Sequence, residues 1–140
     1  MTYVLDASVA GSLFLPDDEA ETARSILAGL SNEDVILVPQ LFWYEMASIV
    51  TASVRKGRLD EGPAFRALEM LRRLGLSLDA RQLEEVTPGL VMLARAHGLS
   101  SYDAAYLELA AREGATLCSH DEGLRGAALA MGLGLLPKSA

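Results

Sequence analysis

The chain has few of the residues that build disulfides and common zinc sites. It contains one cysteine and two histidines in 140 residues. A single thiol cannot form an internal disulfide, so nothing in the sequence requires an oxidising compartment. One cysteine and two histidines without paired spacing also exclude an ordinary Cys/His zinc site. We therefore expect Cys118 to be a small buried residue of a strand.

Long apolar runs are also missing. None approaches the roughly 18–20 residues that a membrane-spanning helix needs. The N-terminus has no basic region, and Asp6 interrupts its apolar run, so a secretory signal peptide is not expected. The sequence predicts a cytoplasmic protein with no membrane partner.

Positive charge is scarce, because 12 Lys and Arg face 19 Asp and Glu and the net charge is −7. Taken alone, this argues against a nucleic-acid-binding protein, which usually presents a basic surface. An acidic total still allows a local basic patch, and bound metal ions would offset part of the charge. Two short basic clusters, at residues 55–58 and 72–73, fall at predicted helix ends, where cations are stabilising anyway and where they could also meet an RNA backbone.

What the chain does have is apolar content. Hydrophobic residues make up 51% of it, which is typical of a globular protein and not of a disordered one. The length predicts one domain over residues 1–140. The high apolar fraction leaves open that a partner or a second copy covers part of the surface.

Short apolar runs alternate with helix-forming segments. The predicted strands are Tyr3–Leu5, Val35–Val38, Leu76–Leu78, Ala115–Cys118 and Leu133–Leu136. The predicted helices cover about residues 9–15, 19–30, 40–56, 61–74, 84–97 (or from Thr87-Pro88), 102–112 and 122–131, with a stop at Pro16 and a cap at Asp17 or Asp18. This alternation predicts an α/β domain with a mostly parallel central sheet of four to five strands flanked by helices.

The stretch from Gly98 to Leu124 reads as a helix, a strand and the start of another helix, with Asp103 near its beginning and Asp121 near its end. A helix that leaves one sheet edge and a strand that returns to it bring both acids to that edge. Asp6 directly follows the first strand. Glu45 lies in an apolar helical stripe, roughly 6 Å down its helix at ~1.5 Å per residue. Since parallel sheets bind ligands at the carboxyl ends of their strands, we expect all four carboxylates at one edge.

Each acid also has an ordinary structural explanation. Asp103 could simply favour the helix dipole, Asp6 and Asp121 could cap helices, and Glu45 could pair with a buried Arg. Four clustered anions, however, would raise one another's pKa unless cations offset them. Oxygen-only ligation suits Mg²⁺ or Mn²⁺, and such ions activate water and stabilise phosphoryl oxygens. The pattern therefore favours phosphodiester hydrolysis.

Four segments match the pattern of a known family: VLDASV at residues 4–9, YE at 44–45, LSSYDAAYLELA at 99–110 and SHDEGL at 119–124. In this order and spacing they resemble the PIN-domain ribonucleases, above all the VapC-type toxins of toxin–antitoxin pairs. The resemblance runs nearly end to end and implies a single PIN-like domain with metal-dependent endoribonuclease activity on RNA. It implies that Asp6, Glu45, Asp103 and Asp121 are the catalytic acids.

The same resemblance implies a magnesium or manganese ion bound chiefly through Asp6 and Asp103, with Glu45 and Asp121 in the first or second shell. It also implies a small cognate antitoxin protein that occludes the acidic site. A homodimer is expected from the family together with the high apolar content.

Two serines and two tyrosines accompany the acids. The family often has Ser or Thr at the position of Ser119, whose hydroxyl is expected to orient Asp121 or a water. Ser8 could position Asp6 or simply begin a helix. Tyr102 and Tyr106 are expected to pack their helix against its neighbours, with stacking on an unpaired RNA base as the alternative for one of them.

Other functions fit parts of this pattern. A PIN-like RNA- or protein-binding module would keep the acids without catalysis. An aspartyl-nucleophile phosphatase needs a second Asp two positions after the first, where Ser8 stands. A Ser–His–Asp hydrolase lacks its Gly-x-Ser-x-Gly turn. The sequence thus predicts an endoribonuclease, with the non-catalytic module as the alternative.

Overall fold

A single parallel sheet forms the centre of the computed structural model, which describes residues 1–14 and 18–138. In these residues the strands are β1 (Thr2–Leu5), β2 (Val35–Val38), β3 (Ser77–Leu78), β4 (Thr116–Cys118) and β5 (Leu135–Leu136). Their order is β3-β2-β1-β4-β5, and all four neighbouring pairs are parallel. The predicted α/β fold with a parallel sheet of four to five strands is confirmed.

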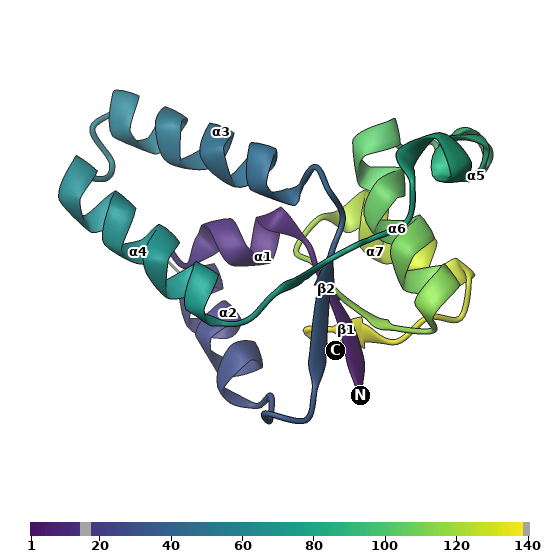
Figure 1. The fold of residues 1–140 in the computed structure, drawn as a ribbon, viewed down its shortest axis with the longest axis horizontal. Helices are drawn as coiled ribbons and strands as arrows, with labels where there is room; N and C mark the ends of the chain where they lie inside the picture. The colour runs from purple at the N-terminus through teal and green to yellow at the C-terminus, as the bar shows by residue number, and fades with distance from the viewer. Residues whose placement is uncertain (15–17, 139–140) are drawn as a thin grey trace.

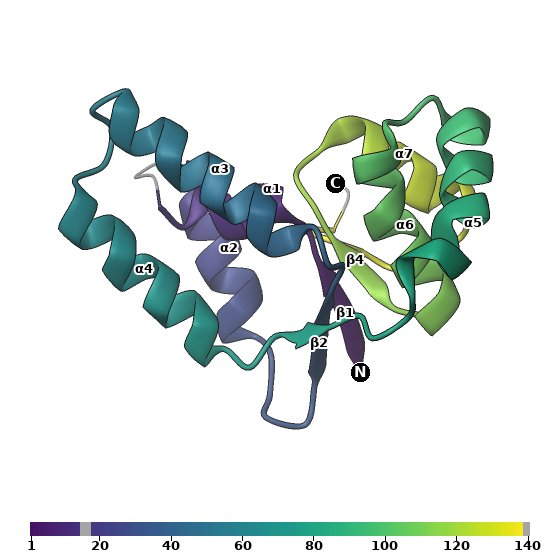
Figure 2. The same ribbon diagram turned by 45° about the horizontal axis from the view of Figure 1, so that its top comes forward.

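Helices cover both sides of the sheet. They are α1 (Ala7–Ser12), α2 (Asp18–Ala28), α3 (Phe42–Arg55), α4 (Glu61–Arg73), α5 (Leu83–His97), α6 (Ser101–Glu113) and α7 (Glu122–Ala130). Figures 1 and 2 show α1–α4 on one side of the sheet and α5–α7 on the other, with α3 and α4 running side by side as an arm that extends away from it. No helix in the described ranges is long and apolar enough to cross a membrane.

The core lies where β1 and β4 meet α6. Val4, Leu5 and Leu117 are at most 1% exposed, as expected for parallel strands buried on both faces. From α6 the largest contribution is Tyr106, which is fully buried. Cys118 is buried too, and burial raises the pKa of its thiol to about 12, which agrees with the prediction of an inert apolar residue. The core thus fixes the end of β1 and the start of α6 relative to each other.

Several helix ends differ from the sequence prediction. Helix α5 begins at Leu83, one residue before the predicted Glu84, so the alternative start near Thr87-Pro88, with Pro88 in the first turn, is wrong. Proline has no N–H for the carbonyl of Glu84, but the Thr87 hydroxyl donates to the carbonyl of Leu83 at 2.7 Å and helps to satisfy this first turn. Helix α3 begins two residues later than expected, at Phe42, and the side chain of Gln40 before it donates to the backbone carbonyls of Asp79 and Arg81.

Helix α1 is shifted toward the N-terminus. It begins at Ala7, directly after β1, because the Asp6 carbonyl accepts from the N–H groups of Val9 and Ala10. The predicted stop at Pro16 and cap at Asp17 lie outside the described residues, and α2 begins at Asp18. The early start of α1 matters for the site, since it places Ser8 in the first turn of α1, two residues after Asp6.

Candidate active site

The carboxyl-terminal edge of the sheet carries the four predicted acids. Asp6 follows β1, and Asp121 follows β4 and precedes α7, whereas Glu45 and Asp103 lie in the first turns of α3 and α6. Electrostatic repulsion couples Asp6 to both Glu45 and Asp103. It also couples Asp103 to Glu45 and to Asp121. The topology therefore brings the four carboxylates into one cluster.

Asp6 is the buried member of the cluster, only 5% exposed. Its Oδ2 atom accepts hydrogen bonds from the hydroxyls of Ser8 and Ser119, each at 2.7 Å. Burial raises the pKa of Asp6 and the charge of Asp103 adds to this, although the two serine hydroxyls act in the opposite direction. Asp6 occupies the N-cap position of α1 but makes no side-chain cap bond, so capping does not explain it. The nearby Ser8 N–H also lowers the pKa of this carboxyl.

The two serines also fix the loop that leads to the fourth acid. The Ser8 hydroxyl accepts from the N–H of His120 at 3.0 Å. The Ser119 hydroxyl accepts from the N–H of Asp121, also at 3.0 Å. Ser8 therefore does more than begin a helix, because it ties Asp6 to the segment after β4.

Glu45 is held by a tyrosine. The hydroxyl of Tyr106 donates to Glu45 Oε1 at 2.6 Å. Burial raises the pKa of Glu45 despite this hydrogen bond, and Asp6 and Asp103 raise it further. Burial and the Glu45 carboxylate together raise the pKa of Tyr106 far above its ordinary range, so Tyr106 stays a donor. The partner of Glu45 is thus a hydroxyl, and no Arg in the described part of the chain pairs with it.

Asp103 and Asp121 face each other at the more open side. Burial and then Asp121 raise the pKa of Asp103, whose N–H donates to the Ser100 hydroxyl at 3.1 Å. Asp121 is exposed, and its Oδ2 accepts from the N–H of Leu124 at 2.8 Å, so it does cap α7. Asp121 therefore both caps α7 and belongs to the acid cluster beside Asp103.

No Lys or Arg of the described residues pairs with this cluster. Within residues 1–14 and 18–138, none of the four carboxylates forms an ion pair. Arg55 begins the first basic cluster at the far end of α3, ten positions after Glu45 and so about 15 Å along the helix axis. Arg72 and Arg73 pair instead with Glu69. The two basic clusters predicted from the sequence therefore do not flank the acids.

The donor set fits a hard divalent cation. All candidate ligand atoms are carboxylate oxygens, which suit Mg²⁺ or Mn²⁺ rather than Zn²⁺ or Cu²⁺. In the described ranges no three His, Cys, Asp or Glu side chains stand at the spacing of a ready-formed metal site. A cation here would thus draw the carboxylates closer together and remove their mutual repulsion.

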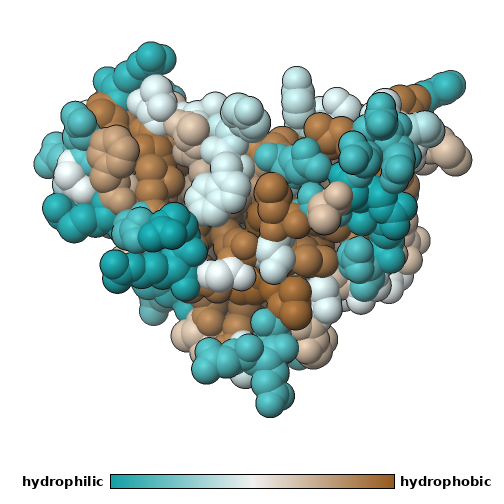
Figure 3. Space-filling view, in the orientation of Figure 1, coloured by the Kyte–Doolittle hydropathy of each residue, from teal (hydrophilic) through white to brown (hydrophobic). Residues whose placement is uncertain are grey.

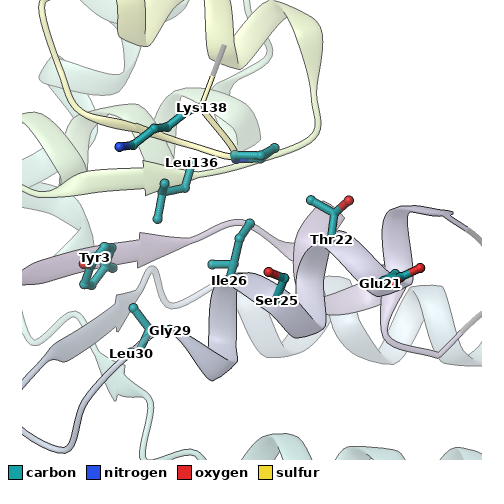
Figure 4. A pocket seen from close by; sticks show the side chains of 10 residues that line it. Tyr3, Glu21, Thr22, Ser25, Ile26, Gly29, Leu30, Leu136 and Lys138 are labelled. Atoms are coloured by element: carbon teal, nitrogen blue, oxygen red, sulfur yellow. The ribbon is translucent and has the colours of Figure 1, made fainter. Parts of the chain in front are cut away.

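One further hollow lies away from the acids. It encloses about 570 Å³ and is lined by side chains of β1, α2 and the segment after β5. Figure 4 shows Tyr3, Ile26, Leu136 and Lys138 around it. None of the four carboxylates lines this hollow, so it is separate from the candidate active site.

Two residues of the site were not predicted from the sequence. Tyr106 was expected to pack α6 or to stack on an RNA base, not to bind a catalytic acid, although its position three residues after Asp103 puts both on one face of that helix. Arg125 was not considered, yet its guanidinium donates to the carbonyls of Ser119 and Pro137 at 2.8 and 2.7 Å. Arg125 thereby fixes the backbone that presents Ser119 to Asp6. No sequence pattern signals it, because both of its partners are backbone atoms.

The fold and this acid cluster define a known class. Residues 3–129 match the model of the PIN domain, so the chain belongs to the PIN domain family. Ribonuclease VapC3 of Pyrobaculum aerophilum is 32% identical over 124 residues, which cover 89% of this chain and 92% of that protein. The resemblance to PIN-domain and VapC-type proteins predicted from four short segments is confirmed.

Crystal structures of other proteins share the fold. Mycobacterium tuberculosis VapC20, described as a Sarcin-Ricin loop cleaving toxin, superposes with a TM-score of 0.67 at 16% identity, covering 94% of this chain and 95% of its own. VapBC2 from Rickettsia felis, bound to a DNA fragment from its promoter, gives a TM-score of 0.68 at 16% identity, covering 96% of this chain and 97% of the other. At these identities the likeness concerns the fold.

Proposed function

We propose that this protein is a metal-dependent endoribonuclease and the toxin of a toxin–antitoxin pair. Membership of the PIN domain family and 32% identity to Ribonuclease VapC3 support a nuclease that acts on RNA. The observation that carries the metal dependence is the cluster of four carboxylates, three with raised pKa, that form no ion pair with any described residue. A non-catalytic binding module would have no need for such repulsion.

Asp6 and Asp103 would hold the cation, with Glu45 and Asp121 beside it. When bound, Mg²⁺ or Mn²⁺ supplies an activated water and stabilises charge on the phosphoryl oxygens. The hydroxyls of Ser8 and Ser119, both on Oδ2, would hold the Asp6 carboxylate in place for the ion.

The protein orients three of the four carboxylates, those of Asp6, Glu45 and Asp121, before substrate arrives. Tyr106 fixes one oxygen of Glu45, and the α7 N-terminus fixes one oxygen of Asp121. Oriented charges of this kind need no rearrangement during the reaction, which is a major source of catalytic power. Ser8, Ser119 and Tyr106 thus act as positioning residues for the acids.

An antitoxin partner is part of the proposal. The VapC name of the 32% identical relative and the VapBC2 structure support it. Exposed apolar surface supports it as well: Figure 3 shows hydrophobic surface between α3 and α4, where a hollow of about 600 Å³ is lined by Trp43, Phe65, Leu68 and Leu76 among others. A homodimer is proposed on the same ground, since Val91 and Met92 of α5 are 51% and 71% exposed.

The test is cleavage of ribosomal RNA by the purified protein in Mn²⁺ or in EDTA. Asp103→Asn removes a proposed ligand and should lower the rate by about 10²- to 10³-fold, as removal of a transition-state stabilising group does. Asp60→Asn is the matched control, because Asp60 is an exposed helix-start acid with no side-chain cap bond. Cleavage that survives both EDTA and Asp103→Asn would contradict the proposal.

A further inference from the structure

Two exposed tyrosines stand next to the acidic site. Tyr44 directly precedes Glu45, and Tyr102 directly precedes Asp103. Tyr44 is 80% exposed and Tyr102 is 66% exposed, so the expectation that Tyr102 packs α6 against its neighbours is wrong. Neither hydroxyl has a hydrogen-bond partner in the part of the chain that the structure describes. Folding therefore does not explain either ring.

Both tyrosines line one hollow of about 350 Å³. We call it the tyrosine hollow, and its lining residues are Leu41, Tyr44, Glu45, Ser48, Ile49 and Tyr102. All of them except Tyr102 come from the start of α3 or the residue before it. Glu45 belongs both to this hollow and to the acid cluster, so the hollow opens beside the place where a phosphate would be cleaved.

We propose that the tyrosine hollow binds one unpaired RNA base beside the scissile phosphate and so helps to select the cleavage position. This inference depends on the proposed ribonuclease function. A base has two apolar faces, which stack on aromatic rings, and polar edges, which need hydrogen-bond partners. The hollow supplies both, because Tyr44 and Tyr102 offer rings while Glu45 and Ser48 offer acceptors for amino groups of a base.

The position of the hollow favours RNA over a protein partner. Glu45 lines the hollow and also belongs to the acid cluster. Because one sugar connects a base to its phosphate, a base in the hollow would place its phosphate near the acids. The hollow between α3 and α4 is larger, at about 600 Å³, and none of the four acids lines it. That surface suits an apolar protein segment, whereas the tyrosine hollow contains a carboxylate of the proposed metal site. The base must be unpaired because a duplex hides its faces.

The experiment compares Tyr44→Ala and Tyr102→Ala with Tyr44→Phe and Tyr102→Phe in Mn²⁺-dependent cleavage of ribosomal RNA. We expect each Ala variant to lose about tenfold in kcat/KM, mainly through KM, and each Phe variant to stay near native, since stacking needs the ring and not the hydroxyl. Mapping of the cut sites should show cleavage at additional positions in the Ala variants. The rise in Tm on adding Mn²⁺ should be unchanged, because these side chains do not ligate the ion.

Met70→Ala is the control, since Met70 is a large apolar residue 71% exposed on α4 and away from the acids. Its kcat/KM should equal that of the native protein. Unchanged cleavage rates and cut sites in both tyrosine-to-Ala variants would overturn the inference. Equal losses in Met70→Ala would overturn it too. If the native protein shows no Mn²⁺-dependent cleavage at all, the proposed function fails and the inference fails with it.

Discussion

At the scale of single residues, the site contains partly or fully buried carboxyl groups, which are unfavourable for folding. A carboxylate as buried as Asp6 costs free energy unless it is neutralised or well hydrogen-bonded. Two serine hydroxyls offset part of that cost, yet burial still holds the pKa of Asp6 above its ordinary value. Groups with such perturbed pKa values gather at functional sites. The same reasoning applies to Glu45 and its single donor, Tyr106.

Tyr106→Phe tests the positioning of Glu45. The change removes one O–H and keeps the ring that fills the core, so the fold should persist. Loss of a net hydrogen bond worth about 1 kcal/mol should weaken Mn²⁺ binding by roughly fivefold and lower kcat for RNA cleavage. Isothermal titration with Mn²⁺ measures the first effect. Tyr3→Phe is the control, since its hydroxyl contacts only the Met1 sulfur at 3.6 Å. Equal Mn²⁺ affinity in native protein and Tyr106→Phe would show that Tyr106 only fills space.

The acids could be predicted residue by residue, but their partners could not. Asp6 and Asp121 follow apolar strand segments, and Asp103 begins a helix, so local pattern and topology suffice to place them. The bond from Tyr106 to Glu45 joins residues 61 positions apart, and that from Ser119 to Asp6 joins residues 113 apart. Such pairs depend on the rotation of α6 and on the exact end of β4, which periodicity does not determine.

At the scale of elements, α6 and β4 hold half of the site, and tight glycine turns set where α6 begins and ends. Gly98 closes α5 with φ +64°, and Gly114 closes α6 with φ +60°. Both closures were predicted from the sequence, since glycine adopts this left-handed conformation without strain. The start of α5 was predicted to within one residue, at Glu84, whereas the alternative start near Thr87-Pro88 is wrong, because the helix continues through Pro88 despite the local preference against an internal proline.

Gly98→Ala should destabilise the protein by about 1–2 kcal/mol, since a Cβ at positive φ is strained even where space is free. Gly126→Ala is the matched comparison, because Gly126 lies within α7 and a Cβ there meets no atom within 4 Å. It should stabilise the protein by about 0.5–1 kcal/mol, since alanine is the better helix former. Urea unfolding of both variants measures the two effects. Equal changes in both would show that φ at residue 98 does not limit stability.

At the scale of the whole molecule, the four carboxylates at one edge of the sheet form no ion pair with the described residues. The stability of the protein should therefore depend on cations and on pH. Asp6, Glu45 and Asp103 all have raised pKa values in the folded state. A raised carboxyl pKa means that the folded state binds more protons than the unfolded state. Its stabilising effect is therefore present at low pH and is lost as pH rises from the unfolded value through the folded one. Asp34, Glu69 and Asp79 have lowered pKa values and act in the opposite direction, so only a difference between variants isolates the site.

Asp6→Asn supplies that difference. Its amide oxygen can still accept from Ser8 and Ser119, but the buried charge next to Glu45 and Asp103 is gone. Without metal, we expect the Tm of the native protein to fall relative to that of Asp6→Asn as pH rises above about 3.8, the unfolded value for Asp. Adding Mn²⁺ at neutral pH should reverse the order, because an ion at one hundred times its Kd stabilises the native protein by about 2.7 kcal/mol and scarcely affects Asp6→Asn. Differential scanning calorimetry measures both Tm differences. The samples are first freed of Ca²⁺ and other metal ions with EDTA, and Mn²⁺ is added only for the second comparison. If Mn²⁺ raises the Tm of both proteins equally, it binds elsewhere on this acidic surface, and the repulsion among the four carboxylates needs another explanation.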